Sequence, residues 1–188
     1  QIVKIFGGQP KLLTTYPEEN FQINISRLKK MITKRTKLLI INSPSNPTGV
    51  TQSSEVLKSI AKLDINIISD EIYQGLNYAQ SPDTILKYKR DSLVVNGFSK
   101  FYSMTGWRLG YCGGPKEIIS GMNKIQSQST TSTSSITMAA AVEALNGDQE
   151  FIKKHNKEFK KRRDLVVEKL SNIEGLSCDI PPGAFYVY

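Results

Sequence analysis

The stretch L-V-V-N-G-F-S-K-F-Y-S-M-T-G-W-R-L-G, residues 93–110, is the part of the chain that best predicts its fold. Its first three residues form a short apolar run of the kind that is buried in a parallel sheet, and Gly97 then allows the chain to turn away. Lys100 therefore follows the end of a buried strand. Because ligands in open α/β sheets bind where the strands end, we expect Lys100 to lie at a ligand-binding edge.

Two cationic side chains of this stretch suggest a specific kind of chemistry. Apolar surroundings favour the neutral form of a lysine such as Lys100, and the neutral amine is a nucleophile toward carbonyl groups. The planar guanidinium of Arg108 is suited to hold a phosphate. The alternative for a lysine after a strand is a solvated surface charge. Together the two residues favour a covalently attached, phosphorylated cofactor.

Segments typical of strands and helices alternate on both sides of this stretch. We expect strands at residues 11–15, 37–41, 65–68, 93–95 and 107–112, and a last strand after the Pro181-Pro182-Gly183 turn. We expect helices at residues 26–34, 54–62, 115–126, 134–145 and 148–170, with Ser26 and either Ser53 or Ser54 as N-caps. This alternation predicts an α/β fold with a mostly parallel sheet that helices cover on both faces.

The predicted domain division lies where Asn146 and Gly147 interrupt the helical pattern. Residues 1–147 would form one domain, and residues 148–188 would form a long helix and the start of a second domain. The chain begins at Gln1 and ends inside the apolar run F-Y-V-Y, so we expect it to be a fragment of a longer protein.

The charge of the chain is unevenly distributed. The formal net charge is +8, and residues 151–163 hold seven Lys or Arg residues and one Glu. The apolar spacing of this region predicts an amphipathic helix whose basic side is solvated. A nucleic-acid surface is the alternative, but no recognition motif accompanies the charge, so we expect no nucleic-acid partner.

Several other features narrow the possible functions. Cys112 and Cys178 are isolated, and His155 has no Cys or acidic neighbours in a metal-binding pattern, so we expect no metal site. The sparse cysteines favour a reducing compartment, and we expect a cytoplasmic protein. No apolar run approaches membrane-spanning length, so we expect no membrane partner.

Three blocks of sequence resemble one known family. Residues 97–110, G-F-S-K-F-Y-S-M-T-G-W-R-L-G, resemble the cofactor-lysine signature of class I and II (fold type I) pyridoxal-phosphate-dependent aminotransferases. Residues 42–49, N-S-P-S-N-P-T-G, and residues 69–73, S-D-E-I-Y, resemble two further blocks of that family in the same order. The amino-acid sequence of these blocks is most similar to that of the bacterial aspartate and aromatic aminotransferases.

The resemblance implies the aspartate aminotransferase fold. Residues 1–147 would be the C-terminal portion of the large cofactor-binding domain, and residues 148–188 the interdomain helix with the truncated start of the small domain. It also implies a homodimer, and an isolated fragment without activity.

The resemblance further implies roles for individual residues around pyridoxal 5'-phosphate. Lys100 would attach the cofactor covalently and act as the catalytic base. Asp70 would hold a proton on the pyridine nitrogen, which makes the ring an electron sink. Tyr73 and Asn46 would hydrogen-bond the phenolic oxygen, and Asn46 would also contact the substrate carboxylate. Without the resemblance, Asp70 is equally typical of a turn cap, Tyr73 of a packed aromatic residue and Asn46 of an ordinary Asn-Pro turn.

The phosphate of the cofactor would be bound by Ser99 and Arg108. Gly97 stands where many relatives carry a serine, so one hydrogen bond to the phosphate is expected to be missing or replaced by water. The resemblance also predicts a cis peptide bond before Pro47.

The function implied by the resemblance is transamination between an amino acid and a 2-oxo acid, with aspartate and 2-oxoglutarate as the expected pair. Aromatic amino acids, or another acidic or sulfur-containing substrate, are the alternatives to this pair. One alternative is a lyase or decarboxylase on the same scaffold, which would use the same cofactor residues. Another is a noncatalytic aminotransferase-like domain with a regulatory or binding role.

Overall fold

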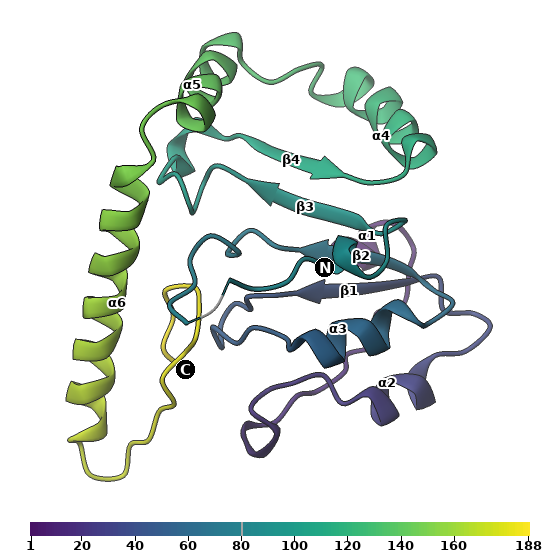
Figure 1. Cartoon of the computed structure of the whole chain (residues 1–188). Helices are drawn as coiled ribbons and strands as arrows, with labels where there is room; N and C mark the ends of the chain where they lie inside the picture. Colours follow the sequence, from purple (N-terminus) through teal and green to yellow (C-terminus); the bar gives the residue numbers. More distant parts are fainter. Residues whose placement is uncertain (80) are drawn as a thin grey trace.

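The computed structural model describes residues 1–79 and 81–188. Within these residues a single sheet has the strand order β1-β2-β3-β4 (Figure 1). Its strands are β1 (Leu38–Asn42), β2 (Asn66–Asp70), β3 (Leu93–Gly97) and β4 (Gly110–Gly113). β1, β2 and β3 are parallel, and β4 is antiparallel to β3. The predicted α/β fold with a mostly parallel sheet is confirmed.

The five predicted helices are present in the predicted order, and a short helix that was not predicted, α1 (Ile2–Ile5), precedes them. The five are α2 (Ile25–Met31), α3 (Ser54–Ala61), α4 (Lys116–Ser129), α5 (Ser135–Asn146) and α6 (Glu150–Ser171). Short 3-10 helices cover Pro17–Glu19, Ile85–Lys87 and Thr105–Trp107. Ser53 caps α3 as predicted, because its side chain accepts a hydrogen bond from the Val56 amide. The predicted cap of α2 at Ser26 is wrong, since Asn24 accepts the corresponding bond from the Arg27 amide.

Two predicted strands are wrong. Neither residues 11–15 nor residues 184–188 form a strand. The only backbone bridge that the described residues form in the C-terminal stretch is the isolated pair Asn77 and Gly183. An apolar run has strand character in its sequence, but a strand also requires a partner for its ladder hydrogen bonds.

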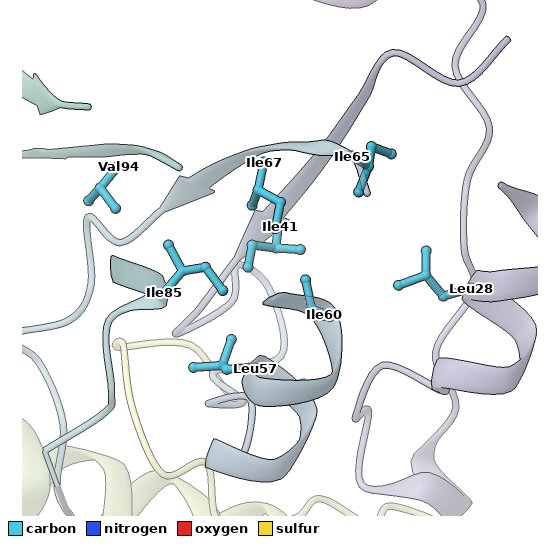
Figure 2. Close-up of a cluster of buried hydrophobic side chains, with 8 residues drawn as sticks. All are labelled: Leu28, Ile41, Leu57, Ile60, Ile65, Ile67, Ile85 and Val94. Carbon is cyan, nitrogen blue, oxygen red and sulfur yellow. The ribbon is translucent and has the colours of Figure 1, made fainter. Parts of the chain in front are cut away.

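The main core lies between the sheet and helices α2 and α3. Ile41 and Ile67 from neighbouring strands point toward Leu57 and Ile60 of α3 (Figure 2). Leu57 and Ile60 are only 2% and 0% exposed, and burial of such side chains contributes about 1.5–3 kcal/mol each. The apolar period of α3 therefore sets which face of the sheet it covers.

The opposite face of the sheet has less cover within the described residues. Because side chains alternate along a strand, Ile40 and Val95 point away from α3, and they are 47% and 36% exposed. We expected helices to cover both faces of the sheet. Within the described residues, α2 and α3 cover one face.

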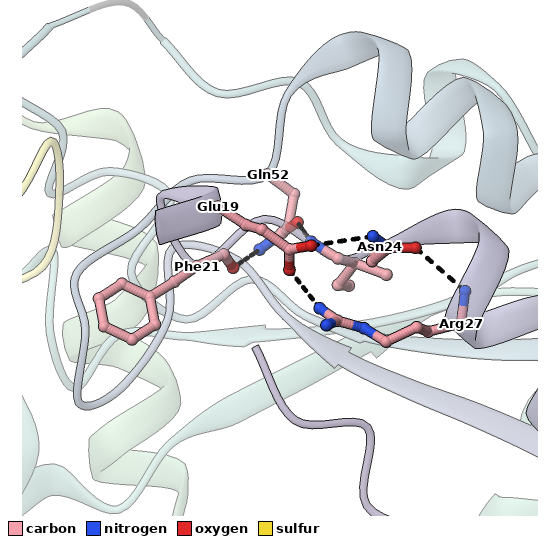
Figure 3. Close-up of polar contacts among 6 residues, drawn as sticks. Glu19, Phe21, Asn24, Arg27 and Gln52 are labelled. Atoms are coloured by element: carbon pink, nitrogen blue, oxygen red, sulfur yellow. Dashed lines mark hydrogen bonds and ion pairs between the residues drawn. The ribbon is translucent and has the colours of Figure 1, made fainter. Parts of the chain in front are cut away.

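A polar network joins the segment before α2 to the loop after β1. The Gln52 side chain accepts from the Ile23 amide at 2.8 Å and donates to the Phe21 carbonyl (Figure 3). Asn24 and Arg27 both donate to Glu19 in the same network. Gln52 is buried, and its backbone amide donates to Ser43 Oγ at 3.0 Å. These bonds hold the loop after β1 in place.

The end of the chain returns to the sheet after α6 (Figure 1). Residues 181–186, here called the C-terminal segment, lie against the loops that follow β1 and β2. The Gly183 amide donates to the Gly49 carbonyl at 3.0 Å, and the Ala184 amide donates to the Leu76 carbonyl at 2.8 Å. Ala184 is 0% exposed. These contacts join residues on both sides of the division predicted at residue 147, and that division stays a prediction.

None of the helices in the described part of the chain is both long enough and apolar enough to cross a membrane.

Candidate active site

The three sequence blocks meet at the carboxyl edge of the parallel strands. In the sheet register Asn42 lies opposite Asp70, and Asp70 lies opposite Val95. Each strand is followed at once by a loop that carries a predicted site residue, namely Asn46, Tyr73 or Lys100. Because parallel strands end at the same edge, these three loops converge there.

Arg108 reaches the same edge because β4 is antiparallel. Gly110, the first residue of β4, lies opposite Gly97, the last residue of β3, so the residues just before β4 return to the carboxyl edge. The connecting loop is held by Thr105, whose hydroxyl donates to the Ser99 carbonyl at 2.7 Å and whose carbonyl accepts from Arg108 Nη1 at 2.9 Å. β4 was expected to begin at residue 107, but residues 105–107 form a 3-10 helix.

The departure from the family pattern at Gly97 has a local structural reason. A Cβ atom built on Gly97 would lie 3.0 Å from both the Gly110 Cα and the Leu109 carbonyl oxygen. A side chain at this position therefore requires the start of β4 to shift. Glycine allows β3 and β4 to approach closely at the point where the phosphate-binding residues are expected.

Lys100 lies beside two aromatic rings. Its ammonium nitrogen is 5.9 Å from the centroid of the Tyr73 ring and 5.7 Å from that of Phe185. The two rings pack edge to face, with centroids 5.5 Å apart. Such contacts stabilise a cation and limit the orientations of the side chain. Phe185 was not predicted to be a site residue, because the run F-Y-V-Y was predicted only to be a strand.

Tyr73 is a buried hydroxyl at the centre of the site. It is 4% exposed, and its hydroxyl lies 2.6 Å from the hydroxyl of Tyr186. Burial raises the pKa of Tyr73 well above its usual value, and the hydrogen bond with Tyr186 adds to this increase. The Asn46 side chain acts on this pKa in the opposite direction, whereas the charge of Asp70 raises it. Tyr73 therefore stays protonated at neutral pH and can donate a hydrogen bond.

Asp70 and Asn46 are tied together through the backbone. Asp70 Oδ1 accepts from the Ile72 amide at 3.1 Å, and the Asp70 carbonyl accepts from Asn42 Nδ2 at 3.1 Å. Asn42 Oδ1 in turn accepts from the Asn46 amide at 2.8 Å. The Asn46–Pro47 bond is cis, as predicted, and the Ser43–Pro44 bond is also cis, which was not predicted.

The neighbouring carboxylate, Glu71, has a different environment from Asp70. It is 3% exposed, and its Oε1 accepts hydrogen bonds from the Ser69 hydroxyl at 2.9 Å, the Thr84 hydroxyl at 3.1 Å and the Ile85 amide at 3.0 Å. A buried carboxylate with three donors anchors the segment around residue 84 to β2. Within S-D-E-I-Y, Asp70 faces the edge and Glu71 is structural.

Two surface hollows in the described residues are lined by none of the predicted site residues. One, of about 310 Å³, is lined by residues that include Tyr16 and Arg27. The other, of about 330 Å³, is lined by residues that include Tyr102 and Trp107. Neither includes Lys100, so the site is identified by its chemical groups rather than by a cavity.

The fold and the site together define a class of protein. The whole chain, residues 1–188, matches the aminotransferase class I and II family, and the chain belongs to that family.

Individual relatives narrow the branch of the family. The chain is 41% identical to the probable aspartate/prephenate aminotransferase of Rhizobium leguminosarum bv. phaseoli, over 100% of this chain and 50% of that protein. It is 40% identical to the aspartate aminotransferase of Geobacillus stearothermophilus, over 99% of this chain and 50% of that protein. The structure of Thermus thermophilus aspartate aminotransferase with maleate matches with a TM-score of 0.96 at 41% identity, over 99% of this chain and 50% of that one. The chain thus spans about half the length of these relatives.

Proposed function

We propose that the full-length protein is a pyridoxal-phosphate-dependent aminotransferase that exchanges an amino group between aspartate and 2-oxoglutarate. The observation that carries this proposal is the position of Lys100 at the carboxyl edge of the sheet, where Asp70, Tyr73 and Asn46 also lie. The choice of aspartate is supported by the names of the relatives.

The side chains at this edge fit the chemical groups of pyridoxal phosphate. The cofactor carries an aldehyde, a ring nitrogen, a phenolic oxygen and a phosphate, which would be bound by Lys100, Asp70, Tyr73 with Asn46, and Arg108 with Ser99, respectively. Within the described residues, Asp70 Oδ2 forms no hydrogen bond and remains available for a protonated nitrogen. The guanidinium of Arg108 uses only Nη1 for the Thr105 carbonyl there, so its other donors remain for a phosphate.

When bound, the cofactor supplies a conjugated ring that takes up the electrons left on the substrate Cα after its proton is removed. Lys100 would attach the cofactor, and its amine, once released, would act as the base that moves the Cα proton. The Asp70 carboxylate keeps the ring nitrogen protonated, and the neutral Tyr73 hydroxyl donates to the phenolic oxygen. Asn46 would also bind the substrate carboxylate. Arg108 and Ser99 hold the phosphate, and thereby fix the cofactor relative to Lys100.

The first test is reductive trapping. The full-length protein is incubated with pyridoxal phosphate, reduced with borohydride and digested, and we expect a pyridoxyl adduct on the peptide that contains Lys100. Lys100→Ala should abolish this adduct. The matched control is Lys89→Ala, because Lys89 is also largely shielded but pairs with Asp91 at 3.3 Å away from the predicted cofactor. Absence of an adduct on Lys100 would contradict the proposal and favour a noncatalytic domain.

Product analysis separates transamination from a lyase or decarboxylase reaction. With aspartate and 2-oxoglutarate we expect oxaloacetate and glutamate in equal amounts, and we expect no continuing turnover when the 2-oxo acid is omitted. A lyase or decarboxylase would turn over its amino acid without the 2-oxo acid. The homodimer and the cytoplasmic localisation stay predictions.

A further inference from the structure

Tyr186 reaches the predicted cofactor site from the far end of the chain. Its hydroxyl lies 2.6 Å from the Tyr73 hydroxyl, and the two rings pack edge to face with centroids 5.6 Å apart. Tyr73 is the residue that faces the phenolic oxygen of the cofactor in the proposed function. A side chain that no sequence block contains is thus in direct contact with a central residue of the site.

The backbone around Tyr186 is held firmly. The Ala184 amide donates to the Leu76 carbonyl at 2.8 Å, and the Tyr78 hydroxyl donates to the Ala184 carbonyl. Arg163 Nη1 donates to the Pro181 carbonyl at 3.0 Å. The bonds of Ala184 attach the C-terminal segment to the loop after β2, which is the same loop that carries Tyr73, and the bond from Arg163 attaches it to α6. The relative position of the Tyr73 and Tyr186 hydroxyls is therefore fixed by hydrogen bonds between the two segments that carry them.

Hydroxyl chemistry indicates how the pair works. A tyrosine hydroxyl donates one hydrogen bond and accepts others, so Tyr73 can accept from Tyr186 and still donate its own proton. Either hydroxyl of the pair can be the donor, and the bond raises the pKa of Tyr73 when Tyr73 is the donor. We propose that Tyr186 is a positioning residue that becomes the donor to Tyr73 when the cofactor is bound, so that the Tyr73 proton is directed toward the phenolic oxygen. This inference rests on the proposed function.

The arrangement strengthens the hold on the cofactor in two ways. Donation from Tyr186 polarises the Tyr73 hydroxyl and makes it a better donor to a negatively charged oxygen. The hydrogen bond between the two hydroxyls also holds the Tyr73 side chain in place before the cofactor binds, which lowers the ordering cost of binding. If Tyr186 instead served only as packing, a phenylalanine would replace it without effect. If Tyr186 competed for the Tyr73 proton, its removal would tighten binding.

The test measures the dissociation constant for pyridoxal phosphate in the full-length protein and in its variants. We expect Tyr186→Phe to raise this constant about fivefold, as for the loss of one hydrogen bond. The control is Tyr16→Phe, which should leave it unchanged because Tyr16 is 45% exposed and its hydroxyl has no hydrogen-bond partner in the described part of the chain. In a Tyr73→Phe background the Tyr186→Phe change should have no further effect.

A spectroscopic readout separates positioning from packing. A weaker donor at Tyr73 leaves more negative charge on the phenolic oxygen, which favours the protonated form of the adjacent Lys100 nitrogen. The pH at which the bound cofactor changes its absorbance should therefore rise in Tyr186→Phe, by about 0.5. Far-UV circular dichroism confirms that each variant is folded, and Tyr186→His, which keeps a donor, should restore part of the affinity.

An unchanged or lowered dissociation constant in Tyr186→Phe overturns the inference, as does an equal effect in the Tyr73→Phe background. An adduct on Lys100 combined with either of these results leaves the proposed function standing. If pyridoxal phosphate does not attach to Lys100 in the unsubstituted protein, both the proposed function and this inference fail.

Discussion

The site is built from two regions that are organised very differently. The loops after β1, β2 and β3 carry Asn46, Tyr73 and Lys100, and each residue is placed by the strand directly before it. The C-terminal segment brings Phe185 and Tyr186 to the same edge, but it is placed by hydrogen bonds to residues that are distant in the sequence. The positions of the reactive side chains thus depend on the neighbouring strands, whereas the surroundings of those side chains depend on contacts with a segment that is distant in the sequence.

The largest expected effect concerns the two carboxylates of the S-D-E-I-Y block. Asp70→Asn should lower kcat about a hundredfold, because it removes the charge that keeps the ring nitrogen protonated. Its free energy of unfolding should change little. Steady-state kinetics and denaturant unfolding of the full-length protein measure the two effects.

Glu71→Gln is the matched variant for this prediction. It weakens the three hydrogen bonds to a buried carboxylate, so we expect a loss of about 1–3 kcal/mol in the free energy of unfolding and a kcat close to that of the unsubstituted protein. A large fall in kcat for Glu71→Gln, with Asp70→Asn unaffected, would reverse the roles assigned to these two residues.

The next effect tests the docking of the C-terminal segment. Gly49 has a φ of +69°, and a Cβ atom there would lie 2.6 Å from the Pro181 Cβ. We expect Gly49→Ala to cost about 1–3 kcal/mol of stability, and to weaken binding of pyridoxal phosphate because Tyr186 is displaced. Thermal unfolding and cofactor titration measure these changes.

Gly121→Ala provides the control for that prediction. Gly121 lies inside α4, and among the described residues a Cβ atom there would meet nothing within 4 Å beyond the backbone of its own helix. Alanine should therefore stabilise the protein by about 0.5–1 kcal/mol. Unchanged cofactor binding in Gly49→Ala would show that the C-terminal segment does not control the position of Tyr73.

The smallest effect concerns the hydroxyl that holds the C-terminal segment. Burial raises the pKa of Tyr78 from 10.0 to about 12, partly opposed by Arg163. Because the raised pKa belongs to the folded state, the contribution to stability is complete below pH 10 and is lost as the pH rises toward 12. The decrease in the free energy of unfolding between pH 9 and pH 11 should therefore be smaller in Tyr78→Phe than in the unsubstituted protein. Equal decreases would assign the pH dependence to other groups.

Much of the sheet was predictable from local patterns. The apolar runs placed β1, β2 and β3 within about two residues of their observed bounds, and Ser53 marked the start of α3. The start of α2 was harder to place, because Asn24 and Ser26 are both good caps and only the structure shows which one bonds the Arg27 amide. Residues 11–15 were wrongly predicted to be a strand, since their sequence carries no information about a partner.

The family blocks also predicted the residues of the candidate site, namely Asn46, Asp70, Tyr73, Ser99, Lys100 and Arg108, and their roles stay predictions. The shared edge of Asn46, Asp70, Tyr73 and Lys100 follows from the parallel strands. Phe185 and Tyr186 were missed because aromatic residues near a turn are common, and nothing in F-Y-V-Y indicates contact with Tyr73. Glu71 could not be separated from Asp70 either, because the sheet pleat alone decides which of two adjacent carboxylates is buried.

The sequence by itself determined the family, the order of the elements and the chemical groups at the ends of the strands, because each of these depends on residues close together in the chain. Tertiary structure alone decided that β4 is antiparallel and returns Arg108 to the edge, that Gly97 allows close approach to Gly110, and that the C-terminal segment brings Tyr186 to Tyr73. These features depend on hydrogen bonds and packing between distant segments. Their free energy is gained only when both partners are folded, so no local pattern records it.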